Sequence, residues 1–160
     1  MQLLLLRHGK AEDRSAAGTD FARELEEKGH EQARHAARVL KAADMLPDIV
    51  LTSPLVRTRQ TADTFTEAAG MPGPVIQSWL SCGMPPHAAL SELAAFPDFD
   101  RIMIVGHEPD FSGLIEHCLG TTAMSIEVRK GSLTCIELLP PSPRAILRFL
   151  LPHKLAKHLE

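Results

Sequence analysis

The chain has 160 residues, the length of one domain of ordinary size. Its composition, with 44% hydrophobic and 23% charged residues, is typical of a globular protein and argues against a disordered or fibrous chain. The formal net charge of -3 argues against a general nucleic-acid-binding protein. We therefore expect a single domain over residues 1–158 that does not bind nucleic acid. Residues 159–160 are set aside as a remnant that an expression vector could leave.

The apolar and cysteine patterns indicate a cytoplasmic protein. The N-terminal run of four leucines is too short for a signal peptide, and no stretch approaches the roughly 18 apolar residues of a transmembrane helix. The cysteines, Cys82, Cys118 and Cys135, are odd in number and contain no CxxC pair, so neither a disulfide framework nor a zinc site is indicated. We expect no membrane partner, no metal and no cofactor, and we favour a monomer.

Short apolar runs bounded by turn residues predict strands, and apolar residues at helical spacing predict helices. In chain order the predicted elements are a strand over 2–7, a loop over 11–19, a helix over 32–41, a strand over 48–51, a helix over 55–69, a strand over 75–76, a helix over 87–95, a strand over 102–105, a helix over 109–119 and strands over 133–138 and 145–150. This alternation predicts an α/β fold with a central, mostly parallel sheet flanked by helices.

Arg7, His8 and Gly9 follow the first predicted strand directly. Ligands of open α/β sheets bind just outside the carboxyl ends of the strands, which is where His8 is expected. An imidazole nitrogen can attack phosphorus and carry the phosphoryl group covalently, and Arg7 would hold phosphate oxygens. Gly9 would let the backbone turn sharply and approach a ligand. We interpret His8 as a nucleophile.

Two further strand ends point to the same rim of the sheet. Ser53 can cap the next helix and Pro54 can open it, which places Arg57 in the first helical turn. His107 follows the strand over 102–105 in the way that His8 follows the first strand. Together with Arg7 and His8 they predict a positive pocket suited to a phosphate dianion. Arg59 does not share a face with Arg57, so we expect it to be solvated, as we do the tail histidines His153 and His158.

These residues resemble the histidine phosphatase superfamily. The matching motifs, in the order of that family, are Arg7-His8-Gly9, Ser53-Pro54 with Arg57-Thr58, Thr61-Ala62 and Gly106-His107. The short chain is further similar to SixA-type phosphohistidine phosphatases at Arg23, Leu25, Gly29, Leu80 and Cys82-Gly83. The resemblance implies a three-layer α/β/α domain like that of phosphoglycerate mutase. It also implies that His8 is phosphorylated, that Arg7 and Arg57 bind phosphate, that His107 contacts the phosphate in the transition state, and that Arg23 lines the pocket.

One departure from the wider family bears on the substrate. Members that act on phosphoesters usually present an acidic residue in the region that aligns with Leu80 to Cys82, where this chain has Ser81 and Cys82. A general acid is worth typically ~10²–10⁴-fold when an alkoxide leaves, whereas the imidazole of a phosphohistidine can carry its own proton. The expected activity is therefore metal-independent hydrolysis of a P–N bond, and the expected partner is a phosphohistidine-bearing protein such as a histidine phosphotransfer domain.

Two alternatives remain open. The first is a small-molecule phosphomonoesterase of the same superfamily that uses another acid, such as Glu12, Asp13 or Glu108. The short connections between elements argue instead for an open, shallow site suited to a protein surface. The second is a non-catalytic module that binds a phosphorylated ligand, and His8 and His107 argue against it because binding alone needs no nucleophile.

Overall fold

The leucine run forms β1 (Gln2–Arg7), the strand around which the sheet is built. Successive side chains of a strand point to opposite faces, and here both faces are buried. Leu3 and Leu5 belong to one hydrophobic cluster, and Leu4 and Leu6 belong to another. Burying a leucine side chain contributes about 1.5–3 kcal/mol, so this run favours an interior position in the sheet over an edge. The computed structural model describes residues 1–159, and Glu160, half of the predicted remnant, lies outside them.

The sheet contains six strands in the order β3-β2-β4-β1-β5-β6. The strands besides β1 are β2 (Ile49–Thr52), β3 (Val75–Ile76), β4 (Arg101–Gly106), β5 (Leu133–Leu138) and β6 (Ala145–Leu151). β1 to β4 pair in parallel, whereas β5 runs antiparallel to both β1 and β6. The prediction of an α/β domain with a central, mostly parallel sheet is therefore confirmed.

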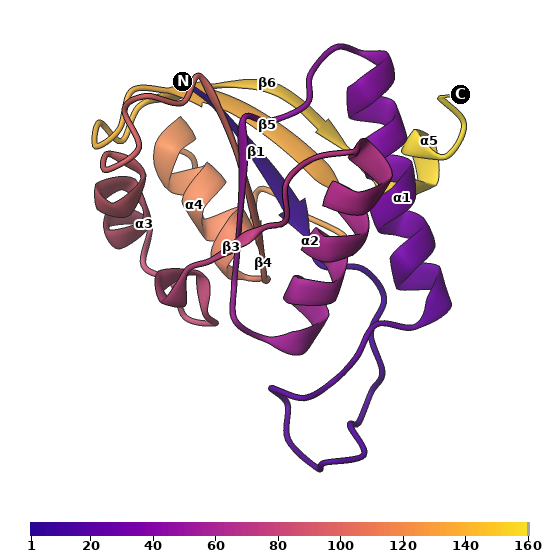
Figure 1. The fold of residues 1–160 in the computed structure, drawn as a ribbon. Helices are drawn as coiled ribbons and strands as arrows, with labels where there is room; N and C mark the ends of the chain where they lie inside the picture. Colours follow the sequence, from indigo (N-terminus) through magenta and orange to yellow (C-terminus); the bar gives the residue numbers. More distant parts are fainter. Residues whose placement is uncertain (160) are drawn as a thin grey trace.

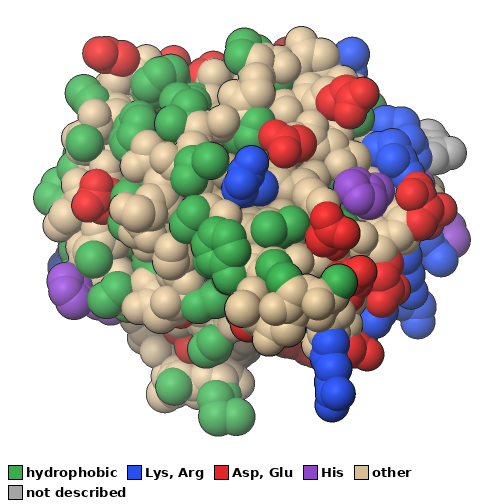
Figure 2. All heavy atoms as spheres, turned by 60° about the horizontal axis from the view of Figure 1, so that its bottom comes forward, with side chains coloured by type: hydrophobic (Ala, Val, Ile, Leu, Met, Phe, Trp, Pro, Cys, Tyr) green, Lys and Arg blue, Asp and Glu red, His purple; other side chains and the backbone are tan. Residues whose placement is uncertain are grey.

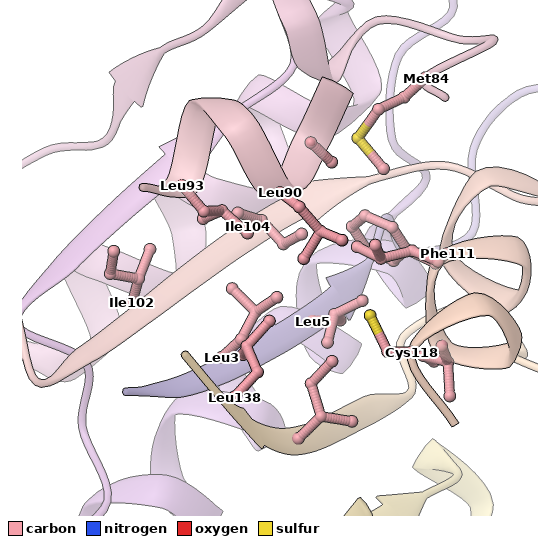
Figure 3. Close-up of a cluster of buried hydrophobic side chains, with 14 of the residues drawn as sticks. Leu3, Leu5, Met84, Leu90, Leu93, Ile102, Ile104, Phe111, Cys118 and Leu138 are labelled. Carbon is pink, nitrogen blue, oxygen red and sulfur yellow. The ribbon is translucent and has the colours of Figure 1, made fainter. Parts of the chain in front are cut away.

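Helices cover both faces of the sheet (Figure 1). α1 (Glu27–Ala42) and α2 (Val56–Ala69) pack on one face. α3 (Pro86–Leu93), α4 (Asp110–Leu119) and the short 3-10 helix η1 (Ser78–Leu80) pack on the other. Figure 3 shows this second face, where side chains of α3 and α4 point toward those of β1 and β4, among them Leu90, Phe111, Leu5 and Ile104. The fold thus has three layers.

The C-terminal tail is packed, in part contrary to the prediction. Residues His153–Ala156 form α5, which lies against α1 (Figure 1). Ala156 is buried and His153 is half-buried, whereas His158 is exposed as predicted. A four-residue helix is too short to show apolar periodicity, so the sequence carried no signal for it. α1 also differs from its prediction, because it begins at Glu27 rather than at residue 32.

Gly9 has a packing role that the sequence did not predict. A Cβ on Gly9 would lie 2.6 Å from the Cα of Gly29, and a Cβ on Gly29 would lie 2.3 Å from the backbone oxygen of Lys10. The two glycines therefore let the end of β1 approach the first turn of α1. Close packing against α1 therefore requires a glycine at position 9. Among residues 1–159, no helix is long and apolar enough to cross a membrane.

Candidate active site

The three strands that carry the predicted site residues end at one edge of the sheet, which Figure 2 turns toward the reader. β4 pairs in parallel with both β1 and β2. The backbone N–H of His8 donates to the oxygen of Gly106 at 3.1 Å, and that of Ser53 donates to Val105 at 3.1 Å. The structure thereby brings His8, Ser53 and His107 together from segments that are far apart in the sequence.

His8 is held as a neutral imidazole. It is 5% exposed, and burial, together with the nearby His107, Arg57 and Arg7, lowers its pKa to about 3. Its Nδ1 lies 2.8 Å from the backbone oxygen of Gly9, an acceptor, so Nδ1 carries the proton and Nε2 is left with a free electron pair. This tautomer is the one that a nucleophilic Nε2 requires.

His107 lies next to His8 and is also neutral. The ring centroids are 5.5 Å apart, and burial followed by the charge of Arg57 lowers the pKa of His107 to about 4. Its Nε2 is 2.9 Å from Oγ of Ser53. Ser53 was predicted to cap the following helix, but the N-cap of α2 is Leu55 and no side chain caps it. The correction gives Ser53 a place in the site, where it orients His107.

Arg57 reaches the site from the first turn of α2, as predicted. The side chain is 6% exposed. Its Nη1 donates to the backbone oxygen of Asp20 at 3.0 Å, and its Nη2 donates to Oδ2 of Asp20 at 3.2 Å. Arg59, two residues on, is exposed as predicted. The segment before α1 therefore fixes the guanidinium from the solvent side.

Arg7 and Arg23 complete the positive edge. Nη1 of Arg7 donates to the backbone oxygen of Val128 at 2.8 Å. Nε of Arg23 donates to the oxygen of Glu12 at 2.6 Å, and its Nη1 donates to Oδ1 of Asp20 at 2.9 Å. The carboxylate of Asp20 thus bridges Arg23 and Arg57, and hydrogen bonding by Arg23 keeps its pKa below the usual range. Sequence reasoning missed Asp20, because a single acidic residue in an irregular loop has no pattern.

Three buried nitrogen atoms at this edge have no hydrogen-bond partner among the described residues. They are Nε of Arg7, Nε of Arg57 and Nδ1 of His107. Buried polar groups are nearly always paired, and both arginine nitrogens are donors. An anion placed between them would supply the acceptors that they lack. Over the same part of the chain, no three His, Cys, Asp or Glu side chains are grouped so that they could hold a metal ion.

The side chains that could protonate a leaving group differ in their distance from the site and in their burial. In the loop after η1, Cys82 is the residue whose side chain reaches Arg57, with Sγ 3.8 Å from Nη2, and burial raises the pKa of its thiol. Glu12 accepts from the backbone N–H of Glu24, and Asp13 is exposed. Glu108, next to His107, is half-buried, and burial raises the pKa of its carboxyl.

Comparisons of the sequence with known proteins agree with this geometry. The model of the histidine phosphatase superfamily (branch 1) matches residues 3–79. The chain is 30% identical over 141 residues to an uncharacterized protein of Picosynechococcus sp., covering 83% of this chain and 82% of that protein. It is 48% identical over 65 residues to the 2,3-bisphosphoglycerate-dependent phosphoglycerate mutase of Cutibacterium acnes, a match that covers 38% of this chain and only 25% of the mutase.

Solved structures share the whole fold. The protein histidine phosphatase SixA complexed with tungstate superposes with a TM-score of 0.86 at 21% identity over 100% of both chains. SixA from Agrobacterium tumefaciens gives 0.80 at 26% identity, covering 94% of this chain and 97% of that one. The α-ribazole phosphatase from Shigella flexneri gives 0.73 at 22% identity, covering 96% and 97%. The matched family model, the relative aligned over most of its length and the shared fold show that this chain belongs to the histidine phosphatase superfamily.

Proposed function

We propose that this protein is a phosphohistidine phosphatase that works through a phospho-His8 intermediate. The observation that carries the proposal is the neutral His8, whose Nδ1 donates to the oxygen of Gly9, which leaves the electron pair of Nε2 free, with Arg57 and Arg7 near the ring. Membership of the superfamily supports phosphoryl transfer at this site. The SixA structures, which share the fold, support the phosphohistidine class of substrate.

The proposed reaction has two in-line steps. Nε2 of His8 attacks phosphorus, the bond to the substrate imidazole breaks, and its electron pair stays on that imidazole nitrogen. Arg7, Arg57 and His107 hold the phosphoryl oxygens, and the unpaired nitrogens of these side chains provide hydrogen bonds as charge spreads in the transition state. Water then attacks the phosphorus of phospho-His8, releases phosphate and restores the neutral histidine. Arg23, joined to Arg57 through Asp20, lines the entrance.

The loop after η1 supports a P–N substrate. Its Cys82 thiol lies beside Arg57, where an acid would be needed to protonate a leaving alkoxide, and its raised pKa keeps the thiol neutral. A phosphohistidine leaves as an imidazole that already carries a proton on its other nitrogen, so it needs no acid there. We further propose that the substrate is a phosphorylated protein, such as a histidine phosphotransfer domain. In this proposal the enzyme works in the cytoplasm, as a monomer, without metal or cofactor.

A panel of substrates tests the proposal. Phosphate release is measured in the presence of a chelator, for wild type and His8→Ala, from a phosphohistidine protein, sugar phosphates and aryl phosphates. We expect phosphohistidine to be the best substrate and His8→Ala to be inactive but folded, as judged by circular dichroism. Full activity of His8→Ala would overturn the mechanism. No turnover of any substrate by the wild type would support a non-catalytic phospho-ligand module.

A small-molecule phosphomonoesterase is the second candidate, and Glu108 favours it. The carboxyl is half-buried next to His107, and its raised pKa is what a general acid needs. Against this role, Oε1 of Glu108 accepts the backbone N–H of Ser112 at 2.8 Å and so is engaged at the start of α4. Faster turnover of a phosphoester than of phosphohistidine in the panel would favour this candidate.

A further inference from the structure

A groove of about 880 Å³ opens beside Arg7, away from His107. It runs between the first half of α1, the segment 127–130 that precedes β5, and α5. Besides Arg7, six basic residues line it, with a single carboxylate, that of Glu127; the six are Lys10, Lys28, Arg129, Lys130, Lys154 and Lys157. Arg7 therefore belongs both to the phosphate site and to one end of this groove.

The walls of the groove are held together by a buried side chain. Gln32 of α1 accepts the backbone N–H of Lys10 through Oε1 at 2.8 Å and donates through Nε2 to the oxygen of Lys130 at 3.3 Å. Gly131 lies against this glutamine so closely that an added Cβ would be 2.8 Å from its Cβ. The backbone positions that carry two of the lysines are thus fixed relative to α1 before any ligand binds.

Most of the positive charge in the groove is uncompensated. Lys10 pairs with Glu26 at 3.5 Å, and Arg129 pairs with Glu127 at 3.1 Å. The other four lysines of the groove make no ion pair with any residue from 1 to 159. Burial, and then the charges of Arg7 and Lys10, lower the pKa of Lys130. In Figure 2, Lys and Arg side chains are most frequent on the right-hand side of the view, where Asp and Glu side chains lie among them, and hydrophobic side chains predominate on the left. This concentration occurs in a protein whose net charge is -3.

We propose that this groove binds the acidic surface of the substrate protein beside its phosphohistidine. The inference rests on the proposed function and names the feature by which a substrate protein is recognised. The charges are spread from Arg7 to α5 and most belong to lysines, whose ammonium groups sit on flexible stems. Such an arrangement suits several carboxylates on a surface better than one compact dianion. It would speed encounter and lower KM without touching the reacting atoms.

Two peptides test the inference. Both contain one phosphohistidine, flanked in the first by Asp and Glu and in the second by Ser and Gln. We expect wild type to show at least a tenfold higher kcat/KM for the acidic peptide, through KM, and the advantage to shrink in high salt. Lys154→Glu/Lys157→Glu should lose that advantage with kcat unchanged; Lys154 is exposed on α5 and Lys157 is exposed directly after it. The matched control is Lys41→Glu/Arg144→Glu, an equal charge change at exposed positions outside the groove, which should retain it.

The remaining outcomes of the peptide experiment separate failure of the groove proposal from failure of the proposed function. Equal kcat/KM for the two peptides in wild type, or an advantage that survives Lys154→Glu/Lys157→Glu, overturns the groove proposal. Hydrolysis of neither peptide contradicts the proposed function instead. In that case the groove is tested separately, by measuring the binding of the unphosphorylated peptides by fluorescence anisotropy. The groove proposal is supported if wild type binds the acidic peptide more tightly than the neutral one and Lys154→Glu/Lys157→Glu does not. Tighter binding of a single-stranded oligonucleotide than of the acidic peptide would overturn the assignment to a protein partner.

Discussion

Arg57 and His8 show how a buried site keeps the proposed nucleophile uncharged among cations. Burial disfavours the imidazolium, and the neighbouring arginines add repulsion, so the electron pair of Nε2 is available at neutral pH. Hydrogen bonds to Asp20 and Val128 hold the guanidinium groups of Arg57 and Arg7 in place, and a guanidinium remains charged at neutral pH. The positive charge of the site thus lies on the arginines, which the proposed mechanism assigns to the phosphate, and not on His8.

The buried guanidinium group of Arg57 leads to the first prediction. We expect Arg57→Ala to lower kcat/KM by about 10²–10³-fold, because a buried donor to the transition state is lost. Arg59→Ala is the matched control, since Arg59 is exposed on the same helix, and its activity should stay within about twofold of wild type. Steady-state kinetics with the best substrate of the panel measures both. An unchanged kcat/KM in Arg57→Ala would remove this residue from the site.

Glu108 gives a prediction that separates two chemistries. Glu108→Gln keeps an oxygen acceptor for the backbone N–H of Ser112. If this hydrogen bond is the only role of Glu108, the variant should hydrolyse phosphohistidine at a rate within about threefold of wild type. A general acid would instead be worth about 10²-fold or more on a phosphoester. The two rates are measured on the same preparation. A large loss on phosphohistidine would contradict the proposal that its leaving group needs no acid.

At the residue scale, what could be predicted depended on the distance from a strand end. His8 and His107 were placed together because each directly follows a buried strand. The contact between Ser53 and His107 was missed because the side chain was interpreted by its local role before a helix. Asp20 was missed because its position depends on how an irregular loop folds back over α2, which no local pattern encodes.

At the element scale, the contact between β1 and α1 gives another prediction. Gly29→Ala would place a Cβ 2.3 Å from the oxygen of Lys10, so the helix must shift, and the free energy of unfolding should fall by about 1–3 kcal/mol. Because Lys10 follows the site directly, kcat should fall as well. Gly113→Ala is the control, since this glycine lies inside α4 with open space around its Cβ position, and it should be neutral or stabilising by up to about 1 kcal/mol. Urea unfolding measures both.

The contrast between β4 and α5 explains which elements the sequence could predict. β4 is an uninterrupted apolar run that ends at Gly106, and its burial on both sides made it easy to identify. α5 has only four residues, of which Lys154 and Leu155 are exposed, so its place is decided by packing against α1 and not by its own residues. The basic groove depends on that packing. It could not be foreseen from lysines scattered along the sequence.

At the scale of the whole molecule, the two buried histidines make stability depend on pH. Their pKa values, about 3 for His8 and about 4 for His107, lie below the ordinary 6.5. When the pH falls below 6.5, the unfolded chain gains protons at these residues and the folded chain does not, so acid favours unfolding. Each histidine contributes about 1.4 kcal/mol per pH unit in this range, on the order of 4 kcal/mol in total between pH 7.5 and pH 5.

Urea unfolding at pH 7.5, 6 and 5 tests this dependence. The variant His8→Asn/His107→Asn should lose clearly less free energy of unfolding over the same interval, because asparagine does not titrate. The comparison within each protein removes any difference in their stability at pH 7.5. Equal losses in both proteins would show that other groups cause the acid sensitivity.

The position of β1 also has a consequence for biosynthesis. This strand is synthesised before the other five strands of the sheet, but its neighbours in the sheet are β4 and β5, which begin at Arg101 and Leu133. At about 5–20 residues per second, the leucine run waits roughly 5–20 s for its first partner. Apolar strands with free backbone groups readily pair with other chains. During this interval the nascent protein is prone to aggregate through β1. A chain interrupted before β4 lacks the strand that joins β1 to β2 and also lacks His107.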